Sequence, residues 1–114
     1  MATVRDATTG TILATDAEWA TSLWARFRGL MLRAPLAPGG GIIIRPCGSI
    51  HMMFMRFAID AVFFDRDGQV TKVARGLRPW TGASGGGRGA RGVVELPRGP
   101  ADGTERGHRL EFEG

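Results

Sequence analysis

The sequence lacks most of the features that would set it apart from ordinary globular proteins. It contains one cysteine, Cys47, so an internal disulfide is excluded and nothing favours an oxidising compartment. No window approaches the roughly 20 consecutive apolar residues that span a bilayer. The first residues also lack the basic stretch and apolar core of a secretory signal. We therefore expect a cytoplasmic protein that makes no contact with a membrane.

Lysine is nearly absent, since 14 of the 15 basic residues are arginines, and the net charge is +4. Six basic residues fall between positions 72 and 98, against a single acid, Glu95. A basic face of this kind attracts anionic partners such as nucleic acid. A solvated surface that keeps the protein dissolved is the simpler interpretation, so a nucleic-acid partner ranks low among our expectations.

The length allows one domain, residues 1–114, because a second core would need more chain. The composition is 43% apolar and 23% charged, which is ordinary for a globular protein. At this size about two thirds of the extended-chain surface is buried on folding, enough for one core. We expect a monomer or a weak homodimer.

Short runs of alternating or β-branched residues, separated by turn residues, predict a mainly β fold. Asp65-Arg66-Asp67-Gly68 is a strong hairpin signal, since glycine tolerates the positive φ that tight turns require. This pattern favours a small, mostly antiparallel barrel or sandwich. Strands are expected around Val4 and Ile12, and at 42–44, 50–55, 59–65, 69–74, 93–96 and 109–112.

One amphipathic helix is expected, beginning at Thr15 and ending before Gly29. The run Thr15-Asp16-Ala17-Glu18 is typical of a capping box at a helix N-terminus. The helix is expected to pack on the sheet across one opening of the barrel. An apolar stripe follows the capping box at spacings of three and four residues: Trp19, Ala20, Leu23, Trp24 and Phe27.

The segment SIHMMFMRFAIDAVFFDRDG, residues 49–68, raises the main question about function. Both of its alternating faces are apolar, so both are expected to be covered. An ionised Asp60 in such surroundings needs a partner, because an unpaired buried charge is very costly. A hairpin that turned near residues 55–56 would place His51 opposite Asp60. The sequence therefore predicts a contact between His51 and Asp60.

The chemistry of this pair stays open from the residues alone. His51 and Asp60 could act as a general base and its orienting acid, with Cys47 as a nucleophile. Cys47, His51, Asp60 and His108 could instead hold a metal, but Cys-x3-His is not a zinc signature, so we predict no metal and no other cofactor. The structural alternative is a buried polar pair that fixes strand register.

The glycine-rich run GASGGGRGARG resembles a phosphate loop only loosely. It lacks the Gly-Lys-Ser/Thr ending that would place a lysine on phosphates and a hydroxyl on magnesium. We interpret it as a mobile surface connection.

The order of the motifs RFRGLMLR, PCGSIHMMFMRFAIDAVFFDRDGQV, LRPW and GVVELPRG resembles the DUF192 family over residues 17 to 112. The combination R-x-x-GLM followed by S-I-H-x(3)-M-x(4)-D-x(2)-F-x-D-x-x-G carries the resemblance. The resemblance implies a compact β-rich fold with a barrel-like sheet and a small helical component, and no established reaction. The matching positions are Arg26, Gly29, Leu30, Met31, His51, Met55, Asp60, Phe63, Asp65, Gly68, Glu95 and Gly99.

The chain departs from the family pattern in three respects. Ala58 stands where family members often have proline, and Gly107-His108 stands where they commonly have a Gly-Asp pair. Many relatives also carry an export signal, which is not expected here.

We predict that the chain binds a small molecule, and we leave open whether it also acts as an enzyme. An arginine, Arg56 or Arg78, would hold an anionic or polyhydroxylated ligand. The alternatives are a hydrolytic or metal-assisted enzyme that uses His51 and Asp60, and a nucleic-acid accessory protein that uses residues 72–98. The expected pocket is lined by His51, Met53, Met55, Arg56, Asp60, Arg78 and Trp80.

Overall fold

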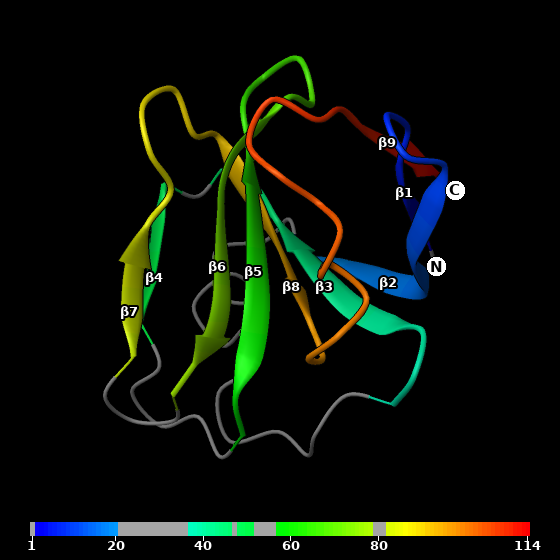
Figure 1. The fold of residues 1–114 in the computed structure, drawn as a ribbon, viewed down its shortest axis with the longest axis horizontal. Coiled ribbons are helices and arrows are strands. Elements are labelled where there is room, and N and C mark those ends of the chain that lie inside the picture. Colours follow the sequence, from blue (N-terminus) through cyan, green and yellow to red (C-terminus); the bar gives the residue numbers. More distant parts are fainter. Residues whose placement is uncertain (1, 21–36, 47, 52–56, 79–81) are drawn as a thin grey trace.

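The computed structural model describes residues 2–20, 37–46, 48–51, 57–78 and 82–114, and this part of the chain is all β (Figure 1). It contains no helix within those residues, so the mainly β prediction is confirmed. The strands are β1 (Ala2–Asp6), β2 (Thr11–Ala20), β3 (Gly40–Ile44), β4 (Ser49–His51), β5 (Ile59–Phe64), β6 (Val70–Leu77), β7 (Ala83–Gly85), β8 (Gly92–Leu96) and β9 (Leu110–Glu113).

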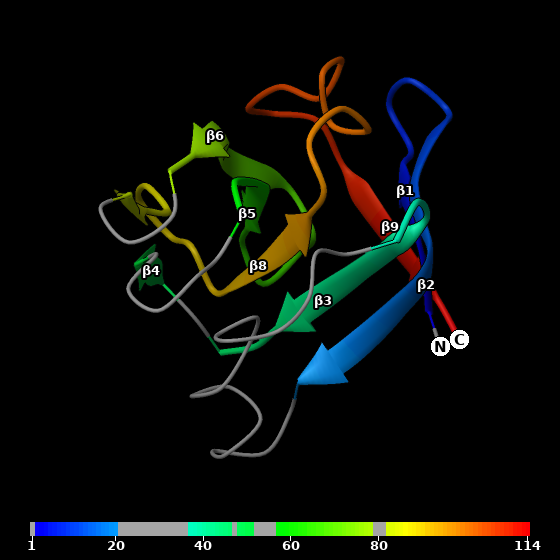
Figure 2. The same ribbon diagram turned by 90° about the horizontal axis from the view of Figure 1, so that it is seen from below.

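Seven of these strands form one curled sheet, in the order β6-β5-β8-β3-β2-β1-β9 (Figure 2). Its two edges are joined at one end by backbone hydrogen bonds. Val70 N donates to His108 O over 2.7 Å, and Leu110 N donates to Gly68 O over 2.8 Å. The sheet is therefore a half-barrel. All the described strand pairs are antiparallel except β2 and β3, which run parallel.

The core has two parts, one on each face of the seven-stranded sheet. Strand β5 feeds both parts, because all six of its residues are buried, as the two apolar faces of this segment predict. The inner cluster is formed by Ala2, Val4, Leu13, Ala14, Ala17, Ile43, Val62, Phe64, Val70, Val94, Leu96, Ala101 and Leu110. The outer cluster is formed by Ala20, Ile42, Ile44, Ile59, Ala61, Phe63 and Val93.

The predicted helix is wrong where it can be compared, because residues 15–20 belong to strand β2. Two residues of β1 face three of β2 there, since Ala2 pairs with Ala17 and Val4 pairs with Ala14. This β-bulge puts Ala14 and Ala17 on the same face of the strand, in the inner cluster. Ala20 lies in the other cluster, on the opposite face. Residues 21–28 of the expected helix lie outside the described residues.

The turns are better predicted than the helix. In the β5–β6 hairpin, Asp65 N donates to Gln69 O over 2.9 Å, and Gly68 has the expected positive φ of 85°. The Asp65 carboxylate also accepts the amide of Asp67 over 2.9 Å. The side chain therefore fixes the turn in addition to the backbone.

The glycine-rich run is not a simple surface connection. Part of it forms β7, which pairs with β4 in a separate two-stranded sheet. Gly86 is buried, and a Cβ there would lie 2.4 Å from the Phe63 ring. Gly92 is equally tight, with a Cβ position 2.4 Å from the ring of Phe64. These two glycines are required for close packing, and the run is an ordered part of the fold.

Candidate functional site

Asp60 lies on β5 with its side chain fully buried, on the face of the inner cluster. Its carboxylate accepts the amide of Gly76 over 2.8 Å and the amide of Gly99 over 3.2 Å. The Arg98 Nε lies 3.2 Å from the same carboxylate, although the arginine side chain is largely exposed. The need for a partner is thus met by Arg98 and two glycine amides. Asp60 ties β6 and the segment after β8 to β5.

The predicted hairpin pairing of His51 with Asp60 is wrong. Strand β4 pairs with β7, and His51 faces Ala83 in that ladder. Strand β5 pairs with β6 on one edge and with β8 on the other, so neither edge is left for β4. Only the backbone of His51 is described, so the contact between the two side chains stays a prediction.

Most of the other predicted pocket residues cannot be compared with the structure. Arg78 is exposed, and its carbonyl accepts the amide of Gly82 over 2.9 Å. The remaining residues, Cys47, Met53, Met55, Arg56 and Trp80, lie outside the described residues.

The loop between β8 and β9, residues 97–109, bridges β6 and β1 and is here called the closing loop. Ala101, within it, is fully buried in the inner cluster. The guanidinium of Arg75 on β6 donates to the carbonyls of Ala101 over 2.9 Å and Asp102 over 3.2 Å, and also to that of Thr104. Asp60 holds the start of the same loop through Gly99.

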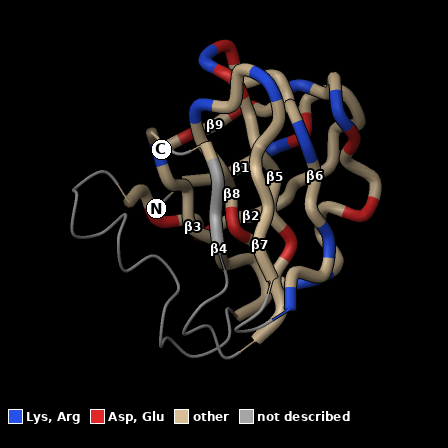
Figure 3. Tube along the Cα trace, turned by 90° about the vertical axis from the view of Figure 1, so that its left-hand side faces the viewer, with Lys and Arg blue, Asp and Glu red and all other residues tan. Residues whose placement is uncertain are grey.

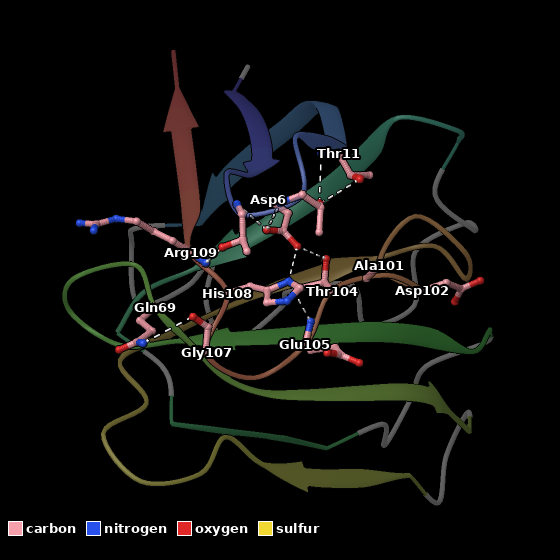
Figure 4. Close-up of polar contacts among 12 residues, drawn as sticks. Asp6, Thr11, Gln69, Ala101, Asp102, Thr104, Glu105, Gly107, His108 and Arg109 are labelled. Carbon is pink, nitrogen blue, oxygen red and sulfur yellow. Dashed lines mark hydrogen bonds and ion pairs between the residues drawn. The ribbon is translucent and has the colours of Figure 1, made fainter.

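Asp6 holds the far end of the closing loop (Figure 4). Its fully buried carboxylate accepts the Thr104 hydroxyl over 2.9 Å and contacts His108 Nδ1 over 2.8 Å. An ionised carboxylate is only an acceptor, so we assign the proton to Nδ1 of His108, which then cannot also accept the Glu105 amide at the longer distance of 3.3 Å. Burial alone would raise the pKa of Asp6, but the hydrogen bonds from His108 and Thr104 outweigh it and lower the pKa below 3.8.

This Asp–His pair was missed from the sequence because its members are 102 residues apart. The one signal was His108, which stands where the family pattern has an acid. The geometry favours a structural role, because the Thr104 hydroxyl donates to Asp6 and is not activated by the imidazole.

Within the described residues no group of three or more His, Cys, Asp or Glu side chains is placed to hold a metal ion. No helix in that part of the chain is long and apolar enough to cross a bilayer.

Two of the six basic residues between 72 and 98 serve the fold directly. Arg75 bonds the closing loop, and Arg98 faces Asp60. On the side of the molecule drawn in Figure 3, basic and acidic positions are interleaved along the strands and loops. The nucleic-acid alternative therefore rests on the other four basic residues.

Glu95 is a buried acid that has no partner among the described residues. It lies on β8, where it pairs with Ile42 of β3 and Ala61 of β5. Both neighbours belong to the outer cluster, so the Glu95 side chain points into that cluster and away from Asp60. It is only 6% exposed, and no hydrogen bond or ion pair joins its carboxyl group to another described residue.

The apolar surroundings change the acidity of Glu95. Burial in the outer cluster raises its pKa from 4.5 to about 7. The group is therefore close to half-protonated at neutral pH and can either donate or accept a hydrogen bond. Buried carboxyl groups with such pKa values are concentrated in binding and catalytic sites. The sequence marked Glu95 as a family position but assigned it no role.

The fold and these contacts define a small half-barrel protein in which one buried acid on the outer face has no partner among the described residues. The chain belongs to the DUF192 family, since the model of that family, described as "Uncharacterized ACR", matches residues 4–112. This confirms the resemblance found in the sequence.

One related sequence and two solved structures are similar to this chain. A UPF0127 protein from Thermococcus sibiricus is 36% identical over 101 residues, which cover 82% of this chain and 64% of the relative. A protein of unknown function from Novosphingobium aromaticivorans has a TM-score of 0.82 at 24% identity, with 96% of this chain and 82% of the other covered. A provisionally named transcription regulator from Sinorhizobium meliloti has a TM-score of 0.80 at 23% identity, with coverages of 97% and 91%. At these identities the two structures establish the fold alone.

Proposed function

We propose that this chain is a small-molecule-binding module whose site lies on the outer face of the half-barrel, around Glu95. The observation that carries the proposal is a carboxyl group that is 6% exposed and has no partner among the described residues. Asp6 and Asp60, which are equally buried, each have several donors. A buried acid that only maintained the fold would be expected to be satisfied in the same way.

The surroundings of Glu95 indicate the class of ligand. Its strand neighbours Ile42 and Ala61 offer apolar contacts, and the carboxyl group supplies one polar anchor, a combination typical of small-molecule sites. A neutral hydroxylated compound fits better than an anion, because an ionised carboxylate repels negative charge. Of the two ligand classes expected from the sequence, the polyhydroxylated class is therefore the one proposed.

A hydrolytic enzyme is the second candidate, and one observation favours it. A carboxyl group with a pKa of about 7 is suited to general acid–base catalysis at neutral pH. No nucleophile is placed beside Glu95 among the described residues, so we rank binding first.

The test compares the wild type with Glu95→Gln, which keeps the shape of the side chain and removes its charge. Binding of glucose, inositol and glycerol is followed by amide chemical shifts, with Glu105→Gln, an exposed acid on the closing loop, as the control. We expect saturable shifts in β3, β5 and β8 for at least one probe, with affinity reduced about tenfold in Glu95→Gln and unchanged in the control. Binding that is indifferent to Glu95→Gln would refute the proposal, as would the absence of any saturable shift.

A further inference from the structure

A second surface feature lies apart from Glu95, between the glycine-rich run and the closing loop. It is a hollow of about 380 Å³ whose lining includes Val70 and Thr71 at the start of β6. Arg88 projects from the turn after β7, and Arg106 projects from the closing loop. Two segments that are distant in sequence therefore bring two guanidinium groups to one hollow.

Neither of these arginines is engaged within the described part of the chain. Arg88 and Arg106 are both exposed, and no ion pair or side-chain hydrogen bond joins either of them to another described residue. Arg75 and Arg98, by contrast, are bound to the closing loop and to Asp60. The donors of Arg88 and Arg106 are free to bind an oxyanion in the forked geometry that guanidinium groups favour.

The turn that carries Arg88 is held firmly in place. Thr71 Oγ donates to Gly86 O over 2.6 Å, and Ala90 N donates to Gly87 O over 3.3 Å. Gly86 also packs against Phe63 so closely that a Cβ would collide with the ring. The position of the Arg88 backbone is thus fixed relative to β6.

The turn that carries Arg106 is fixed to the same strand. Gly107 N donates to Val70 O over 2.9 Å, and His108 N donates to Glu105 O over 3.0 Å. The His108 ring is in turn bound to the buried Asp6. Because both turns are bonded to the first two residues of β6, the spacing between the backbones of the two arginines is set before any ligand arrives, and only the side chains remain to be ordered on binding.

Asp65 also lines the hollow and limits what can bind there. One of its carboxylate oxygens accepts the amides of Asp67 and Gln69, each over 2.9 Å. A carboxylate beside two guanidinium groups disfavours a bare polyanion, because it repels additional negative charge. The same carboxylate can accept a hydrogen bond from a hydroxyl group that neighbours the bound anion.

We propose that this hollow binds the phosphate group of a hydroxylated phosphate ester, with Arg88 and Arg106 on the phosphate and Asp65 on a neighbouring hydroxyl. The site is independent of Glu95 and of the ligand proposed for the outer face. A phosphate group beside a hydroxyl group can come from two sources, a free sugar phosphate or the sugar-phosphate backbone of a nucleic acid.

The test titrates the full chain with glucose 6-phosphate and with a short single-stranded DNA, and follows the amide shifts of residues 86–90 and 105–108. The variants are Arg88→Gln and Arg106→Gln. Arg66→Gln is the matched control, since Arg66 is an exposed arginine on the neighbouring β5–β6 turn and does not line this hollow. Glucose is the control without phosphate.

We expect saturable shifts with glucose 6-phosphate in the low-millimolar range or tighter. Arg88→Gln and Arg106→Gln should each weaken binding about tenfold, and Arg66→Gln should change it less than twofold. DNA that competes with glucose 6-phosphate shows that the hollow accepts the phosphodiester of a nucleic acid, and failure to compete shows that it takes the free ester alone. The proposal is overturned if neither probe shifts these amides, or if Arg66→Gln weakens binding as much as the two hollow variants do.

Discussion

The inner and outer faces of the seven-stranded sheet treat a buried carboxyl group in opposite ways. On the inner face, Asp6 and Asp60 are fully buried, and each accepts several hydrogen bonds that hold the closing loop. On the outer face, Glu95 is nearly as buried and has no such partner among the described residues. Burial of an acid therefore does not by itself identify a site. The hydrogen bonds around the acid decide whether it serves the architecture or remains available for a ligand.

The largest effect is expected from removal of the Asp60 carboxylate. Asp60→Ala leaves the amides of Gly76 and Gly99 without an acceptor, and we expect a loss of about 4 kcal/mol in the free energy of unfolding. Urea denaturation measures this loss. Asp102→Ala, an exposed position on the closing loop, is the control and should change stability by less than about 0.5 kcal/mol. A loss for Asp60→Ala as small as that of the control would show that Asp60 does not anchor the loop.

The contribution of Glu95 to the stability of the fold should depend on pH. Its pKa is raised from 4.5 in the unfolded chain to about 7 in the folded one, so the folded state binds the proton more tightly. The contribution of this pKa shift to the free energy of unfolding is fully present below pH 4.5 and is lost as the pH rises through 7. It amounts to about 3 kcal/mol in all.

The check is the difference in unfolding free energy between the wild type and Glu95→Gln, measured from pH 4 to pH 8. Relative to Glu95→Gln, the wild type should become less stable across this range. A difference that stays constant with pH would mean that the outer face leaves the acidity of Glu95 unchanged.

The pair of Asp6 and His108 should show a coupling of intermediate size. His108→Ala removes a hydrogen bond to a charged group, and we expect a loss of about 2 kcal/mol. A double-mutant cycle with Asp6→Asn isolates the pairwise term. Additive losses in the cycle would show that the two side chains do not stabilise each other.

Asp6 should also affect stability in acid, with the opposite sign to Glu95. Its folded pKa lies below 3.8, so its contribution is present above that pH and is lost as the pH falls through the folded pKa. The wild type should therefore lose stability in acid more steeply than Asp6→Asn does. Parallel acid-unfolding curves for the two proteins would contradict the lowered pKa.

The smallest effect is expected at Arg75, whose side chain lies at the surface. Arg75→Gln removes the donor shared by the closing-loop carbonyls, at a cost of about 1 kcal/mol. Hydrogen exchange should become faster at residues 101–104 and stay the same in β3 and β8. Faster exchange throughout the sheet would indicate a global rather than a local role.

The local parts of this fold could be predicted from the sequence. The strands at 42–44 and 93–96 follow from short β-branched runs, and the β5–β6 turn follows from Asp65 and Gly68. The helix prediction failed at residues 15–20 because the Thr15–Glu18 run, which is typical of a capping box, lies inside β2, where it pairs with β1 and β3. Strand pairing of this kind depends on distant segments and leaves no clear trace in a single sequence.

The candidate site was harder to predict than the strands. Asp60 was correctly expected to need a partner, but its partners come from Gly76, Arg98 and Gly99, and Gly76 and Gly99 lie 16 and 39 residues further along the chain. The Asp6–His108 contact spans 102 residues and is equally non-local. Glu95 was noted as a family position, but which face of β8 it occupies depends on pairing with β3 and β5.

The most direct test of the difference between the two faces is a carbon-13 NMR titration of the Glu95 side-chain carboxyl group in the intact protein. The unpaired, buried position predicts an ionisation midpoint near 7. A midpoint close to 4.5 would show that the carboxyl group is either solvated or held by donors, and the outer face would then contain no unpaired acid to bind a ligand.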